Sequence, residues 1–201
     1  MSTIPDANIK IVTHESILWR GYFLPGHEVC RLFSQDSHWH LEGAAAFAHE
    51  GLPCRLDYHI VCGEDWRTLS AEVDGWVGGT IVGIHLTASP DEHWLLDGHD
   101  QPNIVGCTDV DLNFSPSTNL LPIRRLNLAV GETAEIKVAW LRFPSFRLEP
   151  LEQKYSRLSE TVYRYESAGG KFVADLKVNS TGFVMDYPDI WKSEAVYENP
   201  G

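Results

Sequence analysis

Hydrophobic and polar residues alternate along most of the chain with a period of two, which is the pattern of β-strands that bury one face. The alternation is clearest in four stretches, residues 29–34, 55–60, 135–140 and 172–179. Turn-forming residues such as Gly78-Gly79 separate these stretches at intervals of roughly ten to twenty residues. The pattern predicts an all-β fold of about a dozen strands, which must close or roll up because a long open sheet leaves unpaired edges.

Helical signal is weak by comparison. Residues 116–121 and residues 151–158 each fit about one helical turn, and no longer amphipathic window appears in the sequence. Low-complexity tracts and linker-like segments are absent, so we expect a single domain over residues 1–201. Its ordered core should span residues 9–192, with loose residues before and after it.

The charge balance narrows the choice of partners. The chain has a formal net charge of −12, which repels phosphate backbones and anionic headgroups and argues against nucleic acid and bare membranes as partners. From its first residues and its hydropathy we expect neither a secretory signal nor stable membrane insertion, because no basic and apolar leader pattern and no apolar stretch of about 18 residues occur. Four irregularly spaced cysteines, at positions 30, 54, 62 and 107, are expected to be buried and reduced, although a hairpin disulfide between Cys54 and Cys62 is an alternative. These features predict a cytoplasmic protein.

Cofactor and metal motifs are missing or weak. The phosphate-binding loops GxGxxG and GxxxxGK[ST] and the nucleophile motif GxSxG do not occur, so we expect no cofactor. His38 and His40 share one face of a predicted strand, about 7 Å apart, and His93 and His99 lie near aspartates. Neither spacing matches a strong zinc motif, so these histidines are interpreted as surface residues and remain weak metal candidates.

Two aspartates carry the strongest polar signal. Asp109 and Asp111 flank Val110 and face the same side of a predicted strand. Two close carboxyls can perform acid and base chemistry, as in glycosidases. They can also pair with Arg124 and Arg125, whose guanidinium groups match a carboxylate with two hydrogen bonds. We favour an ion-pair cluster that supports the structure or orients a ligand.

The segment containing the two arginines carries a second prediction. Pro122 should hold Leu121 in an extended conformation, and adjacent residues of an extended chain point to opposite faces. One of Arg124 and Arg125 should therefore turn inward, where it needs an acidic partner.

Aromatic residues are frequent, with seven Trp, seven Tyr and eight Phe. Their ring faces can stack on sugars or line an acyl cavity, and the same residues also fill ordinary β cores. A run of small residues, Gly43-Ala-Ala-Ala, leaves room beside bulky neighbours. It either shapes a cavity or permits close packing of the sheet.

Four stretches together carry a resemblance to a known family. They are residues 53–60 with Asp65-Trp66, residues 106–112 running into 116–126, Gln153-Lys-Tyr with Tyr163-Arg-Tyr, and residues 172–179 with 182–188. In these stretches the chain resembles a bacterial family described as putative glycolipid-binding, and the second stretch is the most specific. The chain departs from the family pattern at Phe114-Ser-Pro-Ser, where Thr-Pro-Phe-Thr is expected, and at Asn179, where Asp is expected.

The resemblance implies a spiral β-roll or incomplete barrel, in which one long antiparallel meander rolls on itself, and a kinship with lipid-carrying proteins. It also implies a binding protein for a glycolipid or other amphiphile rather than an enzyme, although a shared fold does not fix function. The residues we expect to contact such a ligand are Asp109, Asp111, Asn119, Arg124, Arg125, Trp94 and Tyr187. The alternatives are an interaction protein without a small ligand and, less favoured, a sugar- or lipid-acting enzyme that uses the aspartate pair. A homodimer remains open.

Overall fold

The computed structural model describes residues 12–199, which form one sheet of fifteen strands and one short α-helix. The N-terminal strands are β1 (Val12–Gly21), β2 (Gly26–Gln35), β3 (His38–His49), β4 (Leu52–Cys62), β5 (Thr68–Val77), β6 (Thr80–Ala88), β7 (Trp94–Leu96) and β8 (His99–Asp100). The C-terminal strands are β9 (Asp109–Leu112), β10 (Thr133–Arg142), β11 (Arg147–Ser159), β12 (Val162–Ser167), β13 (Phe172–Val178), β14 (Val184–Tyr187) and β15 (Trp191–Glu198). Three 3-10 turns, η1 (Pro102–Ile104), η2 (Ser117–Asn119) and η3 (Ala168–Gly170), and α1 (Leu120–Leu126) complete the described elements.

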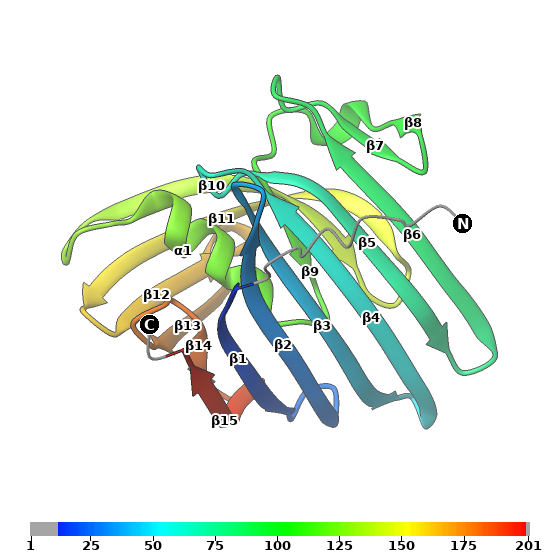
Figure 1. The fold of residues 1–201 in the computed structure, drawn as a ribbon, viewed down its shortest axis with the longest axis horizontal. Helices are drawn as coiled ribbons and strands as arrows, with labels where there is room; N and C mark the ends of the chain where they lie inside the picture. The colour runs from blue at the N-terminus through cyan, green and yellow to red at the C-terminus, as the bar shows by residue number, and fades with distance from the viewer. Residues whose placement is uncertain (1–11, 200–201) are drawn as a thin grey trace, which may run out of the picture.

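The strand order shows how the sheet is built. It runs β8-β7-β6-β5-β4-β3-β2-β1-β15-β14-β13-β12-β11-β10-β9, so the two halves of the chain join where β1 pairs with β15. Within residues 12–199 every strand pair is antiparallel except β9 with β10. The sheet curls around α1, as Figure 1 shows, and β9, the strand at one edge of the sheet, returns to the inside of β5. There the Val110 amide donates to Thr68 Oγ1 at 3.1 Å and the Thr68 amide donates to Thr108 O at 3.3 Å.

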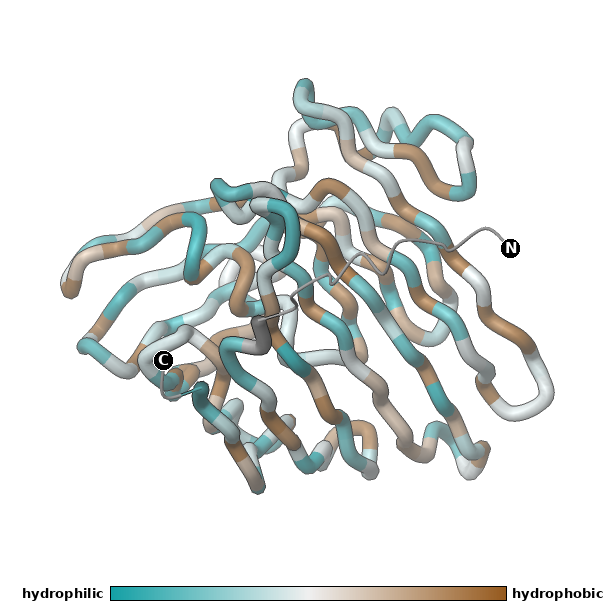
Figure 2. The backbone as a smooth tube through the Cα atoms, viewed as in Figure 1, coloured by the Kyte–Doolittle hydropathy of each residue, from teal (hydrophilic) through white to brown (hydrophobic). Residues whose placement is uncertain are grey.

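This arrangement confirms the prediction of an all-β meander rolled on itself with little helix. The sheet does not close into a barrel. Along β4, residues 54, 56, 58, 60 and 62 are buried, whereas the residues between them are more exposed. Figure 2 shows the same alternation as brown and teal segments along the long strands. The period-two pattern therefore buries the inner face of the roll, as expected for half-buried strands.

An aromatic cluster fastens the two halves of the roll at one end. Phe143, at the β10–β11 turn, packs edge-on against Phe47 and His49 of β3, with ring centroids 5.3 Å and 4.8 Å apart. Phe114 and Phe146 also contact Phe143. Edge-to-face aromatic pairs contribute beyond the area they bury, so this cluster stabilises the curled form of the sheet.

The helical predictions had mixed outcomes. Residues 117–126 form η2 and then α1, so a helical turn exists where it was predicted and continues further. The expectation that Leu121 is extended was wrong. Pro122 is the third residue of α1, within the first turn, where a backbone N–H has no helical partner and proline is tolerated. The helical turn predicted at residues 151–158 was also wrong, because these residues lie in β11, where pairing with β10 and β12 decides their conformation.

Other expectations concern the termini and the cysteines. The last strand continues to Glu198, which pairs with Glu15, so ordered structure extends past residue 192, while residues 1–11 and 200–201 lie outside the described part. All four cysteines are buried and free, as expected. The alternative of a Cys54–Cys62 hairpin disulfide was wrong, because both residues lie on β4. Among the described residues there is no helix with the length and hydrophobicity to cross a membrane.

The small-residue run has a clear packing role at Gly43. A Cβ atom there would lie 2.4 Å from the Tyr58 hydroxyl, so the Tyr58 ring can cross β3 only over a glycine. The hydroxyl donates to Glu28 Oε1 of β2 at 2.7 Å, and Ser115 donates to the same oxygen at 2.5 Å. Close packing therefore explains Gly43, and Ala45 is fully buried beside it.

We predict that Gly43→Ala destabilises the protein by about 1–3 kcal/mol, because the added methyl group displaces Tyr58 from Glu28. Gly79→Ala is the matched control. Its Cβ would have no heavy atom within 4 Å, and we expect a change below about 0.5 kcal/mol. Urea unfolding of the two variants measures the difference, and equal stabilities would contradict the packing role of Gly43.

Candidate functional site

The best-defined polar interaction inside the roll joins α1 to β9. Arg125 Nε donates to Asp109 Oδ1 at 3.0 Å, and its Nη2 donates to Oδ2 at 2.6 Å and to Thr108 Oγ1 at 2.9 Å. The Asp109 side chain is fully buried and that of Arg125 is 14% exposed. A bidentate guanidinium is the partner that a buried carboxylate requires. The predicted inward arginine is therefore Arg125.

Arg124 points to a different environment. Its guanidinium lies over the Trp66 ring at 5.0 Å, and Nη1 donates to the backbone oxygen of Thr181 at 3.5 Å. The side chain is exposed. Consecutive residues of an α-helix are about 100° apart around the axis, which separates the two arginines as effectively as an extended chain would.

Asp111 differs from Asp109 although both aspartates lie on β9. It accepts a hydrogen bond at 2.6 Å from Gln153 Nε2 of β11, and the ion pairs of the described residues do not include it. Burial without a cationic partner raises the pKa of Asp111 to about 6, and the bond from Gln153 opposes the rise. Asp111 is therefore the carboxyl of the pair that has no cationic partner among the described residues.

Tyrosines surround this part of the interior. Tyr165 packs against Tyr155 and Tyr187, with ring centroids 5.2 Å and 6.3 Å away, and the Tyr155 hydroxyl donates to Asn119 Oδ1 at 3.0 Å. Burial raises the pKa of all three phenols, and the charge of Asp111 contributes to each shift. The phenols stay protonated at neutral pH, so they offer hydroxyl groups rather than charges.

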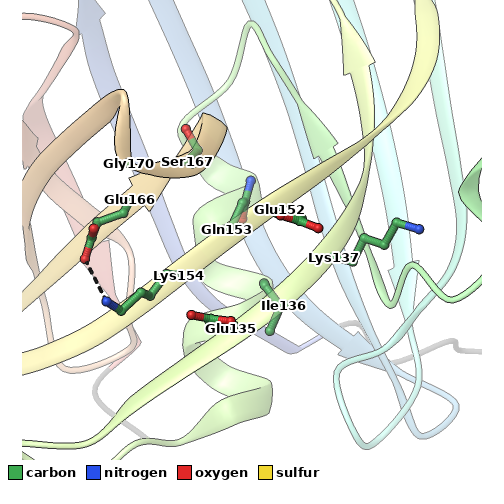
Figure 3. Close-up of a pocket in the computed structure, with 10 residues that line it drawn as sticks. Glu135, Ile136, Lys137, Glu152, Gln153, Lys154, Glu166, Ser167 and Gly170 are labelled. Carbon is green, nitrogen blue, oxygen red and sulfur yellow. Dashed lines mark ion pairs between the residues drawn. The ribbon is translucent and has the colours of Figure 1, made fainter.

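A recess of about 540 Å³ lies at the rim of the roll beside this interior. Its lining residues are Glu135, Ile136, Lys137, Glu152, Gln153, Lys154, Glu166, Ser167, Gly169 and Gly170. They come from β10, β11, the end of β12 and η3 in the β12–β13 connection. Figure 3 shows them together, with Lys154 and Glu166 joined by an ion pair of 3.3 Å. Gln153 belongs both to the recess and to the hydrogen bond with Asp111, so it connects the two.

The recess has the chemistry of a site for a polar, uncharged group. Carboxylates accept hydrogen bonds, whereas the ammonium and amide groups donate them, so the lining can satisfy hydroxyl groups in both roles. Its volume is in the range of ordinary ligand pockets. Among residues 12–199, no three His, Cys, Asp or Glu side chains gather as a metal site.

The structure brings most of the predicted ligand residues together and separates two. Asp109, Asp111, Asn119, Arg125 and Tyr187 contribute to the polar and aromatic interior behind the recess. Arg124 lies on the other side of α1, as described above. Trp94 is fully buried, and its indole N–H donates to Cys107 O at 2.9 Å, so its ring presents no exposed face.

The histidines predicted as weak metal candidates are dispersed. His38 and His40 share the outer face of β3, but His40 Nδ1 lies 3.0 Å from His59 Nε2, and His38 contacts the backbone oxygen of Asp36. Two others lie apart from them. His93 is 3.7 Å from Asp91, and His99 is exposed on β8.

Sequence reasoning missed the recess and two buried acids. Gln153 was noted only within the family resemblance, and the charged residues around it resemble any exposed strand face. Glu15 and Glu28 are fully buried, and each has one oxygen without a hydrogen-bond partner among the described residues. The position of Glu28 was detectable, because it shares its side of the strand with Cys30 and Leu32.

The chain is similar to proteins of one family and to two solved structures. The profile of a protein family described as "Putative glycolipid-binding" matches residues 16–193. A DUF1089 family protein from Pseudomonas aeruginosa has 34% sequence identity and a TM-score of 0.72, with 82% of this chain and 91% of that chain covered. A beta-barrel-like protein of domain of unknown function DUF1849 from Brucella abortus has 10% identity and a TM-score of 0.56, with 95% and 99% covered, and shows a common fold alone. No curated protein matches the chain significantly.

We predict that Arg125→Met destabilises the fold by about 3 kcal/mol, because it leaves the Asp109 carboxylate buried without a cation. Arg124→Met removes an equal charge from the next residue, on the exposed side of α1, and should cost less than about 1 kcal/mol. Guanidinium or urea unfolding compares the two variants. Equal losses of unfolding free energy in the two variants would show that the Arg125–Asp109 ion pair does not stabilise the fold.

A second prediction concerns Glu28. Burial raises the pKa of its carboxyl from 4.5 to about 8, and the hydrogen bonds from Ser115 and Tyr58 only partly oppose this. The folded state therefore holds a proton that the unfolded chain releases. The resulting stabilisation is complete below pH 4.5, declines as pH rises and is lost above about pH 8. Between pH 5 and 8, the Glu28→Gln variant should gain stability relative to the unsubstituted protein by on the order of 1 kcal/mol per pH unit. Urea unfolding at several pH values measures the stability of both proteins. A stability difference that stays constant with pH would contradict the prediction.

Proposed function

The chain belongs to the putative glycolipid-binding family, and we propose that it binds an amphiphile through a hydroxyl-rich headgroup held in the recess between β10, β11 and the β12–β13 connection. Family membership supports a binding role in general. The choice of headgroup comes from the residues of the recess. The observation that carries the proposal is the connection of this polar recess to Asp111 through Gln153.

The charges of the lining favour a neutral polyol over an anion. Three glutamates face the recess with two lysines, which gives a formal charge of −1. Lys154 is engaged by Glu166, so Lys137 is left as the cation without an ion pair among the described lining residues. A phosphate or sulfate headgroup would meet more negative than positive charge here, whereas sugar hydroxyls can donate to Glu135 and Glu152.

The packing of the interior also favours the headgroup as the part that is bound in the recess. Leu120 and Leu121 of α1 and Phe183 are fully buried, so side chains fill the centre of the roll. An acyl chain would have to displace them, at a cost in packing. The headgroup therefore occupies the recess while the chain of the amphiphile stays outside the centre of the roll.

The aspartate pair supports this binding role better than catalysis. Glycosidases need two carboxyls that exchange protons or attack the sugar. Asp109 is held by Arg125 and Thr108, so its oxygens are engaged. Asp111 acts through Gln153, fixing the amide so that its remaining hydrogen-bonding groups can face the recess.

We predict that isothermal titration calorimetry detects n-octyl glucoside below its micelle concentration and detects no comparable binding of an octyl sulfobetaine, which has the same chain without a sugar. The double variant Glu135→Gln, Glu152→Gln should weaken glucoside binding about tenfold, because hydrogen bonds to charged groups are the stronger ones. Glu160→Gln, at the β11–β12 turn outside the recess, is the matched control and should bind as the unsubstituted protein does. Equal affinity for both detergents, or no binding of either, would contradict the proposal.

A further inference from the structure

Four hairpin tips meet along one end of the roll and form what we call the tip edge, residues 21–26, 48–53, 76–81 and 187–191. Backbone hydrogen bonds of 2.9 Å connect neighbouring tips. The Tyr22 amide donates to Ile190 O, the Ala48 amide to Pro25 O and the Gly78 amide to Pro53 O. Three of these turns project along the lower margin of the broad β1–β6 face in Figure 1. The tip edge is therefore a fixed structural feature built from strands far apart in the sequence.

Large apolar side chains protrude from this edge. Phe23 is 77% exposed, Ile81 80%, Tyr22 52% and Leu52 47%. Single exposed apolar residues are normal on protein surfaces. Here they occupy three hairpin tips that lie side by side, and the turns hold them away from the core. Exposed apolar groups gathered in this way mark an interaction surface.

The charges of the molecule are distributed unequally between its two ends. The tip edge contains no Lys or Arg and two carboxylates, Glu50 and Asp189. The turns at the opposite ends of β2 to β6 contain five carboxylates and one arginine, namely Asp36, Glu64, Asp65, Asp91, Glu92 and Arg67. An edge without lysine or arginine, whose one histidine is His49, has little attraction for anionic headgroups or acidic proteins. The Tyr ring instead suits the boundary between an apolar phase and water, and Phe and Leu side chains can enter its apolar side.

We propose that the tip edge docks on an electrically neutral lipid surface, with Phe23, Tyr22, Leu52 and Ile81 entering the headgroup region. This is a peripheral contact made by side chains and differs from insertion of the backbone into the bilayer. A second copy of the chain fits the edge less well, because a stable interface buries about 800 Å² per partner. The four exposed apolar side chains are few beside the roughly 20–30 residues that each partner contributes to such an interface.

Docking on lipid rests on the proposed function, because binding of an amphiphile headgroup gives the protein a reason to approach a lipid surface. The β12–β13 connection that borders the recess lies at the same end of the sheet as the β14–β15 turn, and Phe172 of β13 contacts Tyr187 with ring centroids 6.1 Å apart. A protein docked by its tip edge would hold the recess close to headgroups displayed by the surface.

The test is flotation of the full chain with phosphatidylcholine vesicles that contain no glycolipid. We expect part of the protein to float with the vesicles, with little change between 0.05 and 0.5 M salt, because apolar contacts are not screened as ion pairs are. The double variant Phe23→Ser, Ile81→Ser should reduce the bound fraction about tenfold. Val130→Ser changes an apolar residue that is 55% exposed, in the α1–β10 loop at the other end of the roll, and should leave the bound fraction unchanged.

Three outcomes would overturn the docking proposal: no flotation, flotation lost equally in the Val130 variant, or sedimentation showing a dimer that the tip variants dissociate. The proposed function is tested independently by measuring how the Phe23→Ser, Ile81→Ser variant binds soluble octyl glucoside. That binding should persist when docking is lost, so failure of one proposal is distinguishable from failure of the other.

Discussion

The bidentate ion pair between Arg125 and Asp109 connects the two elements that define this fold, helix α1 inside the roll and the edge strand β9. Asp109 is fully buried on β9, and a carboxylate in that position is costly without a guanidinium beside it. Because Arg125 supplies that partner, β9 can return across the inside of β5 and pair with β10. α1 then fills the centre of the roll, and the remaining polar space lies at the rim, where the recess forms.

Strand β9 carries two carboxyls, of which one has a cationic partner and the other does not, and the proposed function depends on this difference. Asp109 has its charge neutralised and its geometry fixed. Asp111, two residues further on, is desolvated and held by the Gln153 amide. Since Gln153 also lines the recess, a group bound there is in contact with the interior through one hydrogen-bonded side chain. A polar recess backed by protonated tyrosines suits a ligand rich in hydroxyl groups more than one with a strong charge.

The sequence predicted the class of fold because alternation with a period of two acts at every strand and survives local errors. It also predicted that one arginine turns inward to the aspartates, since a buried carboxylate demands such a partner whatever the backbone does. It failed at Leu121, where a proline in the first turn of a helix looks the same as a proline that ends one. It failed at residues 151–158, where pairing with two neighbouring strands overrides local preference. Trp94 shows a further limit, because composition cannot separate a buried ring with a satisfied N–H from one that faces a ligand. The recess was not predictable, since it depends on where β12 leaves β11, which no local pattern encodes.

We propose that this protein carries an amphiphile with a hydroxyl-rich headgroup. Native mass spectrometry of the freshly purified full chain, followed by unfolding and extraction, tests it most directly. We expect a reproducible mass excess that leaves on unfolding as an amphiphile with an uncharged, hydroxyl-rich headgroup, or the appearance of such an excess when glycolipid extracts are added. A mass equal to that of the chain alone, unchanged by those extracts, would contradict it.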